Sequence, residues 1–450
     1  MIKPLNKLVG LKKIDFDGYV SEGKIKLSPA RLIPTYKVGD EITLTSIFLA
    51  TLKLVKEFRY NFFGETKITK AGKPYFYTEV SFEDVSQDSR IDGLIIVVVS
   101  GIIKEAVFLE MKNKNNELDK NQLEKYIDVA RKLKVGKMVT VSNQFVIDSS
   151  QSPIDIRVPK SISLHHFSWT YIKTISRLLL DEKHKFSDID DEDQMHIMKE
   201  VLFYLESKAS GVTGYHQMNK GWVNLVESIN SQIRLKLSDE FVKDAVLSWQ
   251  EQERNMSLML SRELGLLVKS SIASNKQKLK ERTKNDIKNL VTKHKLNSAL
   301  SIKGTVSNIK ISVDFNTRTV CLSNKVTPPL DKGVKARIGW IIRQLETFQK
   351  HQPELFSQIE NDIWILGNVK FSSNDVQVKY SNIVNLYDYV DKDIFDFEIM
   401  FIKDFGKGLS NSKKFITNMQ TNLISYYQCV VQHLKEWKAP PPKLESKSSK

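Results

Sequence analysis

The sequence predicts a multidomain α/β protein with an N-terminal mixed-sheet domain, a helical middle region and a C-terminal α+β domain. Three observations support this fold class. The 450 residues are roughly three times the length of one typical domain. Strand-like and helix-like patterns alternate between residues 45 and 143. Helical patterns dominate from about residue 164, and strand patterns return after Gly304.

The first domain is expected over residues 1–160. Residues 45–60 are predicted to form an amphipathic helix, because Ile47, Leu52 and Val55 share one side. Alternating or β-rich residues predict the strands, and a second amphipathic pattern predicts the next helix. The remaining elements follow in the order strands 73–82, 92–100 and 102–112, helix 119–133, and strand 136–143.

The rest of the chain divides into two further regions and a tail. A helical middle region is expected over residues 161–303, with a long polar helical stretch from about 237 to 297. Residues 304–438 are predicted to form a C-terminal α+β domain, since strand-like runs surround helices near 335–350 and 412–437. Residues 439–450 are rich in Pro, Ser and Lys, and we expect a disordered basic tail.

Composition narrows the class of partner. The chain has 68 Lys and Arg residues against 53 Asp and Glu, a net charge of +15 that favours polyanions such as nucleic acid. With 41% hydrophobic and 27% charged residues, it is not wholly disordered, collagen-like or membrane-spanning. Cys321 and Cys429 form no CxxC pair, and the N-terminus has no apolar signal segment. We therefore expect a cytoplasmic protein with reduced thiols and no membrane partner.

The most informative stretch spans residues 91–126. If its first two strands form a hairpin around the Ser100-Gly101 turn, facing positions sum to about 202, which places Asp92 opposite Glu110. Strand alternation then puts Lys112 on the same face as Glu110. Two carboxylates and an ammonium at one end of a hairpin suit a hard divalent cation, Mg²⁺ or Mn²⁺, next to a phosphodiester.

Asp92 with Glu110-x-Lys112, followed by Gln122-x-x-x-Tyr126, resembles the PD-(D/E)XK nuclease superfamily and the QxxxY element of RecB-like exonucleases. Ile91 stands where the family motif often has proline. The resemblance covers about residues 40–145 and implies the same order of helix, three strands, helix and strand. It implies that Asp92 and Glu110 bind the metal, that Lys112 assists the attacking water, and that Gln122 and Tyr126 position substrate.

Further acids and bases are candidates for the same function. The resemblance suggests a glutamate from the first helix region as a metal ligand, with Glu41 the first candidate, and Glu79 lies on the strand before Asp92. The alternatives are a helix N-terminal acid for Glu41 and a solvent-facing strand residue for Glu79. A basic stretch around residue 280 is a candidate nucleic-acid contact, or equally a solvated linker helix or part of a coiled coil. Its candidate residues are Lys276, Lys280, Arg282 and Lys284.

These features favour a Mg²⁺-dependent deoxyribonuclease, with DNA as partner and a bacterial defence or restriction role as one setting. No ATPase motif occurs, so any motor or defence-system partner would be a separate protein. The main alternative is a non-catalytic nucleic-acid-binding or assembly subunit that keeps the nuclease fold. A third is a multidomain protein with a chance motif, whose hairpin carries solvated charges and whose Tyr126 packs in the core. The oligomeric state is left open.

Overall fold

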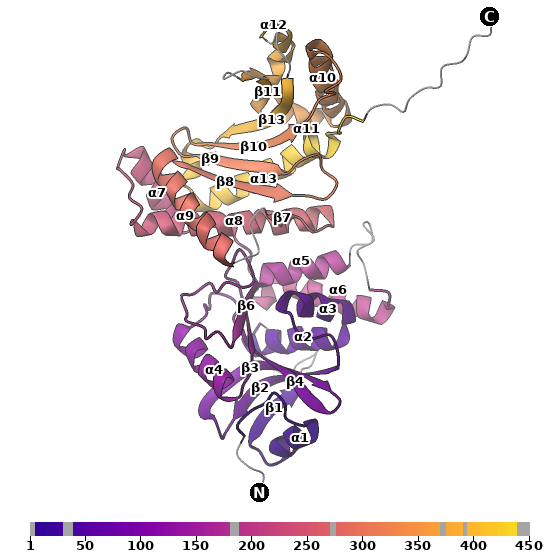
Figure 1. The fold of residues 1–450 in the computed structure, drawn as a ribbon, viewed down its shortest axis with the longest axis vertical. Helices are drawn as coiled ribbons and strands as arrows, with labels where there is room; N and C mark the ends of the chain where they lie inside the picture. Colours follow the sequence, from indigo (N-terminus) through magenta and orange to yellow (C-terminus); the bar gives the residue numbers. More distant parts are fainter. Residues whose placement is uncertain are drawn as a thin grey trace, which may run out of the picture. The chain divides into compact units, whose positions relative to one another are not determined.

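The computed structural model describes residues 5–29, 39–180, 189–270, 276–369, 375–389 and 394–438, without the side chains of 86–89 and 276–278. The protein is mixed α/β, with one mixed and one antiparallel sheet (Figure 1). It divides into two compact units. Unit 1 comprises Met1–Tyr215, Gln250–Leu267 and Ile272–Leu279, and unit 2 comprises His216–Trp249, Val268–Ser271 and Lys280–Lys450. The predicted tail, 439–450, lies outside the described residues.

The sheet of unit 1 has, in the described residues, six strands in sequence order. They are β1 (Ile25–Pro29), β2 (Lys73–Phe82), β3 (Ser86–Val99), β4 (Ile102–Met111), β5 (Lys137–Ser142) and β6 (Ser163–Ser168). The pairs from β1 to β4 are antiparallel, whereas β4–β5 and β5–β6 are parallel. The sheet is therefore mixed, as the sequence predicts. We did not expect β6, which falls where helical patterns were predicted to begin.

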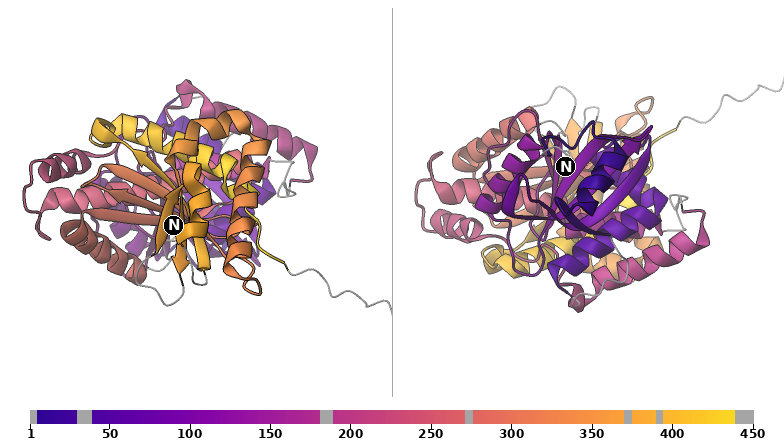
Figure 2. Two further views of the ribbon diagram at one scale, coloured as in Figure 1. Left: turned by 90° about the horizontal axis from the view of Figure 1, so that it is seen from above. Right: turned by 90° about the horizontal axis from the view of Figure 1, so that it is seen from below.

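Both faces of this sheet are buried. One face carries α2 (Glu41–Leu54), α3 (Lys56–Thr66), α5 (Trp169–Leu179) and α6 (Glu192–Glu206) over odd-numbered residues of β4 and β5. The other face carries α1 (Lys13–Ser21) and α4 (Lys120–Lys132) over even-numbered residues of the same strands. Figure 2 shows α1 lying across the strands in its right-hand view. Even-numbered polar residues of β4 and β5 thus point to the α4 side.

The β3–β4 hairpin has the predicted register over its main part. Gly93 pairs with Leu109 and Val97 with Glu105, so facing positions sum to 202, and the register shifts by one residue near the turn. Ser100 and Gly101 both have positive φ angles, of 50° and 74°. Two such residues give the twist that joins antiparallel strands directly, and glycine adopts this conformation without steric cost. The turn and the open end of the hairpin therefore lie where the sequence places them.

The predicted helix over 45–60 is wrong in its bounds. The chain is helical from Glu41 and breaks at Val55, which is extended at φ −103° and ψ 107°. The guanidinium of Arg59 donates to the carbonyls of Leu52 and Lys53, which the break leaves without helical partners. Every residue of α2 from 43 to 52 is buried, so α2 is an internal helix rather than an amphipathic one.

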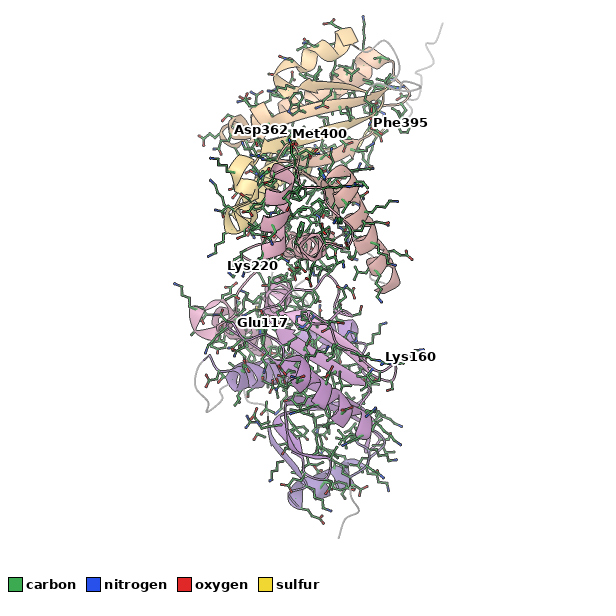
Figure 3. The ribbon with its side chains drawn as sticks, turned by 90° about the vertical axis from the view of Figure 1, so that its left-hand side faces the viewer. Glu117, Lys160, Lys220, Asp362, Phe395 and Met400 are labelled. Carbon is green, nitrogen blue, oxygen red and sulfur yellow. The ribbon has the colours of Figure 1, made fainter. Side chains whose placement is uncertain are left out.

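Unit 2 contains, among the described residues, a seven-stranded antiparallel sheet ordered β12-β11-β13-β10-β9-β8-β7. The strands are β7 (Lys269–Ser270), β8 (Lys295–Ser301), β9 (Ile309–Asp314), β10 (Thr319–Val326), β11 (Ile363–Val369), β12 (Val376–Lys379) and β13 (Ile394–Asp404). The helices are α7 (Lys220–Asn230), α8 (Glu240–Leu264), α9 (Lys276–Lys293), α10 (Val334–His351), α11 (Pro353–Ile359), α12 (Leu386–Tyr389) and α13 (Ser412–Cys429), with α8 and α9 divided between the units. Figure 3 adds the side chains.

Aromatic side chains fill the core of unit 2. Tyr426 of α13 stacks on Phe401 of β13, and its hydroxyl donates to the Ile399 carbonyl at 2.9 Å. Trp222 of α7 stacks against Trp249 of α8, with ring centroids 6.2 Å apart. The predicted helical stretch over 237–297 is wrong at two places, because α8 ends at residue 264 and residues 295–301 form β8. Along β8 every second residue is buried, which is the pattern of a strand with one face in the core and not of a helix.

Candidate active site

Two carboxyl groups meet at the open end of the β3–β4 hairpin. Asp92 lies one residue before Gly93 and Glu110 one residue after its partner Leu109, and both acids lie on the α4-facing side of the sheet. Asp92 Oδ2 accepts a hydrogen bond from the Met111 amide at 2.8 Å, which ties β3 to the end of β4. The Glu110 side chain is 0% exposed. The structure therefore brings together the two acids that the hairpin argument pairs.

Lys112 joins this acid pair to a second element. Its Nζ lies 2.7 Å from Glu110 Oε1 and 3.3 Å from Glu41 Oε2, and its side chain is 14% exposed. Glu41 is the first residue of α2, and its other oxygen accepts from the Asn116 amide at 2.6 Å. Glu41 thus lies at the edge of the cluster, where it contacts the lysine. We call Asp92, Glu110, Lys112 and Glu41 the acid–lysine cluster.

Burial sets the protonation of this cluster. Desolvation, and then the charge of Asp92, raise the pKa of Glu110, and desolvation also raises the pKa of Asp92. Burial alone would lower the pKa of Lys112, but the adjacent Glu110 carboxylate outweighs it and raises that pKa above its ordinary value. Without a further cation, the two acids therefore resist carrying two negative charges together.

The donor set fits a small divalent cation. No N–H or O–H group of the described residues donates to the buried Glu110 Oε2. The Glu110 side chain instead lies within hydrogen-bond reach of the Asp92 carboxyl, and two buried carboxyl groups in contact need a shared proton or a cation. Mg²⁺ is commonly held by one or two carboxylates, with water and substrate phosphate as the other ligands. No group of three or more His, Cys, Asp and Glu side chains suited to a metal occurs in the described ranges. The two carboxyl groups in contact, Asp92 and Glu110, are the side chains that would hold such a cation.

Gln122 and Tyr126 lie on α4, above the same face of the sheet. Gln122 Nε2 donates to the Tyr126 hydroxyl at 2.9 Å, and that hydroxyl donates to the Arg90 carbonyl on β3. Burial raises the pKa of Tyr126, and the charges of Glu110 and Asp92 raise it further. The tyrosine is thus close enough to the cluster to respond to its charge, while its hydroxyl anchors α4 to β3. Gln122 is half-buried.

Glu79 is held by a different partner. Its carboxylate accepts from Arg90 Nε at 2.8 Å, and its side chain is 13% exposed. Its backbone φ is +54°, a left-handed value within β2 that is uncommon for a non-glycine residue. Burial raises the pKa of Glu79, and Asp92 contributes to the rise although Arg90 opposes it. Glu79 therefore lies beside the acid pair but is bound to Arg90.

Buried polar contacts fix the chain just after β4. The indole of Trp169 donates to the Lys112 carbonyl at 2.8 Å. The amide of Asn113, which is 1% exposed, donates to the carbonyls of Gly39 and Ser210 at 2.7 and 3.1 Å. These bonds hold the backbone that carries Lys112, and they connect it to the segment that begins α2. A rigid support of this kind limits the geometries that the cluster can adopt.

Sequence reasoning missed two polar residues in the same layer. Thr140 of β5 is the register partner of Glu110, and His166 of β6 is the register partner of Thr140. Both are buried, at 0% and 1% exposure. The polar positions at the end of the predicted strand 136–143 were the available signal for Thr140. The sequence gives no spacing that connects His166 to it, because β6 itself was not predicted.

The residues of α9 that were predicted to contact nucleic acid differ in their surroundings. Lys280, Lys284 and Lys288 are exposed on α9 at intervals of four residues. Arg282 instead pairs with Asp286 at 3.2 Å and donates to the Asn297 carbonyl, so its guanidinium serves the fold of unit 2. The side chain of Lys276 lies outside those that the structure describes.

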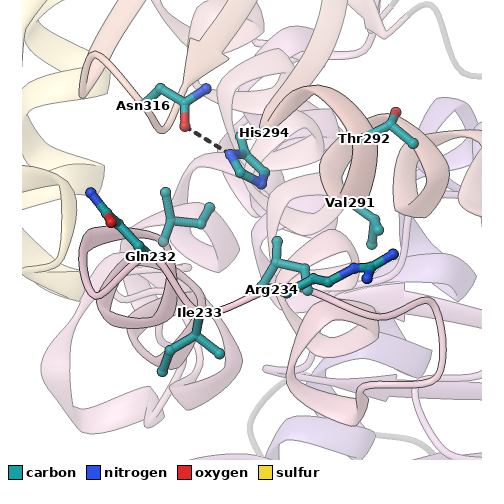
Figure 4. A pocket seen from close by; sticks show the side chains of 9 residues that line it. Gln232, Ile233, Arg234, Val291, Thr292, His294 and Asn316 are labelled. Carbon is teal, nitrogen blue, oxygen red and sulfur yellow. Dashed lines mark hydrogen bonds between the residues drawn. The ribbon is translucent and has the colours of Figure 1, made fainter.

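A pocket of about 450 Å³ lies in unit 2 (Figure 4). Arg234 and His294 line it together with apolar residues, and His294 Nδ1 lies 2.7 Å from Asn316 Oδ1. Its lining contains no carboxylate.

Comparison with protein-family models, curated proteins and solved structures gives no match for the chain. The described residues also contain no helix whose length and apolar character would suit a membrane crossing.

Proposed function

We propose that unit 1 is a metal-dependent deoxyribonuclease of the PD-(D/E)XK kind. The observation that carries this proposal is the acid–lysine cluster, in which Asp92, Glu110 and Lys112 meet on one face at the end of a hairpin. The arrangement of β2 to β5 with flanking helices also agrees with the core that the sequence resemblance implies.

Each residue of the cluster has a distinct role in this proposal. Asp92 and Glu110 would hold Mg²⁺ or Mn²⁺, which when bound supplies charge stabilisation at a phosphodiester and a more acidic water. Lys112 keeps its proton, donates to the attacking water and offsets negative charge on the phosphate. Glu41 holds the lysine ammonium toward the acid pair from the start of α2.

In this proposal Gln122 and Tyr126 of α4 position the DNA strand. Tyr126 fixes α4 against β3 through Arg90, and Gln122, half-buried and bonded to that tyrosine, presents its side chain beside the cluster. We assign to Gln122 the contact with DNA. Tyr126 would hold the Gln122 side chain in position through their hydrogen bond. Glu79, bound to Arg90, remains a further acid near the metal ligands.

Cleavage of plasmid and single-stranded DNA with and without Mg²⁺ tests this function. We expect cleavage by the full chain and a loss of roughly 100-fold or more in Lys112→Ala, because an electrostatic group of the site is removed. Lys104→Ala is the matched control, since Lys104 is an exposed lysine of β4, the strand that ends one residue before Lys112. Equal cleavage by wild type and Lys112→Ala would overturn the site. No cleavage of any substrate would favour the non-catalytic binding or assembly subunit.

We also propose that the exposed lysines of α9 contact the DNA backbone. Lys280, Lys284 and Lys288 lie at i, i+4 and i+8, about 6 Å apart along the helix. Like charges at this spacing destabilise a helix, and a row of phosphates would relieve that repulsion. This stripe refines the predicted set, from which Arg282 is removed because Asp286 neutralises it.

Salt-dependent DNA binding distinguishes this stripe from a merely solvated helix. Changing Lys280, Lys284 and Lys288 together to Ala should weaken binding and lower the slope of log affinity against log salt by about 3 for duplex DNA. The control changes three exposed lysines elsewhere in unit 2, Lys407, Lys413 and Lys414, to Ala, with the same loss of charge. Equal effects of the two triple variants would show that the α9 lysines contribute only to the overall positive charge and do not form a specific contact with DNA.

We place this activity in the cytoplasm, where the free thiols of Cys321 and Cys429 would stay reduced. A role in bacterial defence or restriction, beside a separate motor protein, is the setting that we propose for it. The support for that setting is the combination of the nuclease-like unit with a second folded unit of similar size.

A further inference from the structure

A row of polar side chains extends from the acid pair across two more strands. Glu110, Thr140 and His166 are successive register partners on the parallel strands β4, β5 and β6. Neighbouring strands lie about 4.8 Å apart, and register partners in parallel strands project from the same face. All three side chains are almost completely buried. A buried polar row of this kind needs a hydrogen-bond arrangement in which every member is satisfied.

The contacts of His166 determine its tautomer. His166 Nε2 lies 3.0 Å from the Gln144 carbonyl oxygen, which only accepts, so Nε2 carries the proton. Burial lowers the pKa of His166 to about 4, so the ring is neutral near pH 7. Its Nδ1 is therefore an acceptor, and it lies 2.8 Å from Thr140 Oγ1. Of the two acceptors within reach of the Thr140 hydroxyl, His166 Nδ1 at 2.8 Å is closer than the His165 carbonyl oxygen at 3.4 Å, so the hydroxyl donates its proton to His166.

This arrangement leaves the lone pairs of Thr140 available in the layer that contains Glu110. No N–H or O–H group in the described part of the chain donates to Glu110 Oε2, and the side chain contacts the Asp92 carboxyl. A hydroxyl free to rotate would donate to that carboxylate, but His166 takes the proton first. The Thr140 oxygen and the Glu110 carboxylate are then two acceptors that project from adjacent strands on the same face of the sheet. Such a pair binds a donor placed between them, such as a water molecule held by the acid pair.

We propose that Thr140 is a positioning residue of the acid–lysine cluster, and that His166 sets the orientation of its hydroxyl so that Thr140 acts as an acceptor beside Glu110. The inference rests on the proposed function, because the donor that Thr140 receives is water bound at the metal site. His166 acts through Thr140 and does not contact the acid pair itself. Neither residue belongs to the predicted motif.

Metal affinity and cleavage test this role in the full chain. Calorimetry with Mn²⁺ should show a 10- to 100-fold loss of affinity in Thr140→Val, as for other residues that orient metal ligands, and Thr140→Ser should retain the affinity. His166→Phe should lower it as well, whereas His166→Gln keeps an acceptor for Thr140 and should restore most of it. The matched control is His165→Phe, on the same strand with its side chain on the opposite face of the sheet.

The double variant decides whether the two residues act as one unit. If His166 works through Thr140, Thr140→Val with His166→Phe should lose no more affinity than Thr140→Val alone. Losses that multiply would overturn the proposal, as would an unchanged affinity in folded Thr140→Val.

A readout without metal separates failure of this inference from failure of the proposed function. Nitrogen NMR of the His166 ring should show the proton on Nε2, and a proton on Nδ1 would overturn the assigned orientation. Wild-type protein that neither binds Mn²⁺ nor cleaves DNA, yet has the expected tautomer, would overturn the proposed function and with it the role of Thr140.

Discussion

Lys112 connects two carboxylates from distant parts of the chain, Glu110 at the end of β4 and Glu41 at the start of α2. The sequence predicts the first contact, because strand alternation places residues 110 and 112 on one face. It names Glu41 only through the family resemblance. The Thr140–His166 contact was not predictable, because the register between parallel strands is set by tertiary packing and not by a local turn.

His166 should make unit 1 sensitive to acid. Burial lowers its pKa from 6.5 to about 4 in the folded protein, so the unfolded chain binds the extra proton first as pH falls below 6.5. The stability is complete above pH 6.5 and is lost progressively down to pH 4, by about 3 kcal/mol in total. We expect the urea midpoint of wild type to fall more steeply than that of His166→Gln between pH 7 and 4.5.

The control for this prediction is His196→Gln, at a surface position on α6. That variant should follow the wild-type curve. If the urea midpoints of wild type and His166→Gln fell in parallel with pH, protonation of His166 would not destabilise the folded protein, and the prediction would be wrong.

Among the elements, those with a strong local signal were predicted best. The β3–β4 hairpin and α4 lie where turn residues and apolar spacing place them. The break between α2 and α3 was missed because Val55 has no proline or glycine beside it, and the interruption depends on Arg59 reaching back to the freed carbonyls. Strand β8 was missed because its residues continue a lysine-rich helical pattern and turn extended only against β9.

Helix α4 depends on its N-terminal cap. Asp119 accepts from the Gln122 amide at 2.7 Å, and such a cap contributes about 1 kcal/mol. Asp119→Ala should therefore lower the thermal midpoint and speed hydrogen exchange at Gln122. Asp128→Ala is the matched control, because Asp128 lies on the same helix in an exposed pair with Arg131, and exposed pairs contribute little. Equal exchange in both variants would mean that packing alone holds the helix end.

At the level of the whole molecule, the two units are interleaved along the chain. Part of unit 1, residues Gln250–Leu267, comes after the first segment of unit 2 in the chain. Leu258 of α8 is fully buried in the unit 1 core, and the Arg254 guanidinium lies 5.3 Å from the ring centroid of Tyr171. The three regions predicted from the sequence do not show this interleaving, because it depends on which residues contact one another and not on local composition.

A fragment of residues 1–215 should therefore be much less stable than the same residues in the full chain. Loss of one buried leucine side chain costs about 2–5 kcal/mol, and this fragment lacks Leu258 together with the rest of that segment. A fragment of residues 1–279 should recover the thermal transition of unit 1, measured by near-ultraviolet circular dichroism. A fragment 1–215 with the full-length transition would contradict the interleaved core.

The interleaved chain also has a consequence during translation. The first 215 residues leave the ribosome while the segment that completes their core is still unsynthesised, since 34 residues of unit 2 come first. At roughly 5–20 residues per second, the nascent chain exposes an incomplete apolar surface for several seconds. The acid–lysine cluster would consequently mature late in synthesis, and this interval is when the growing chain most needs a chaperone.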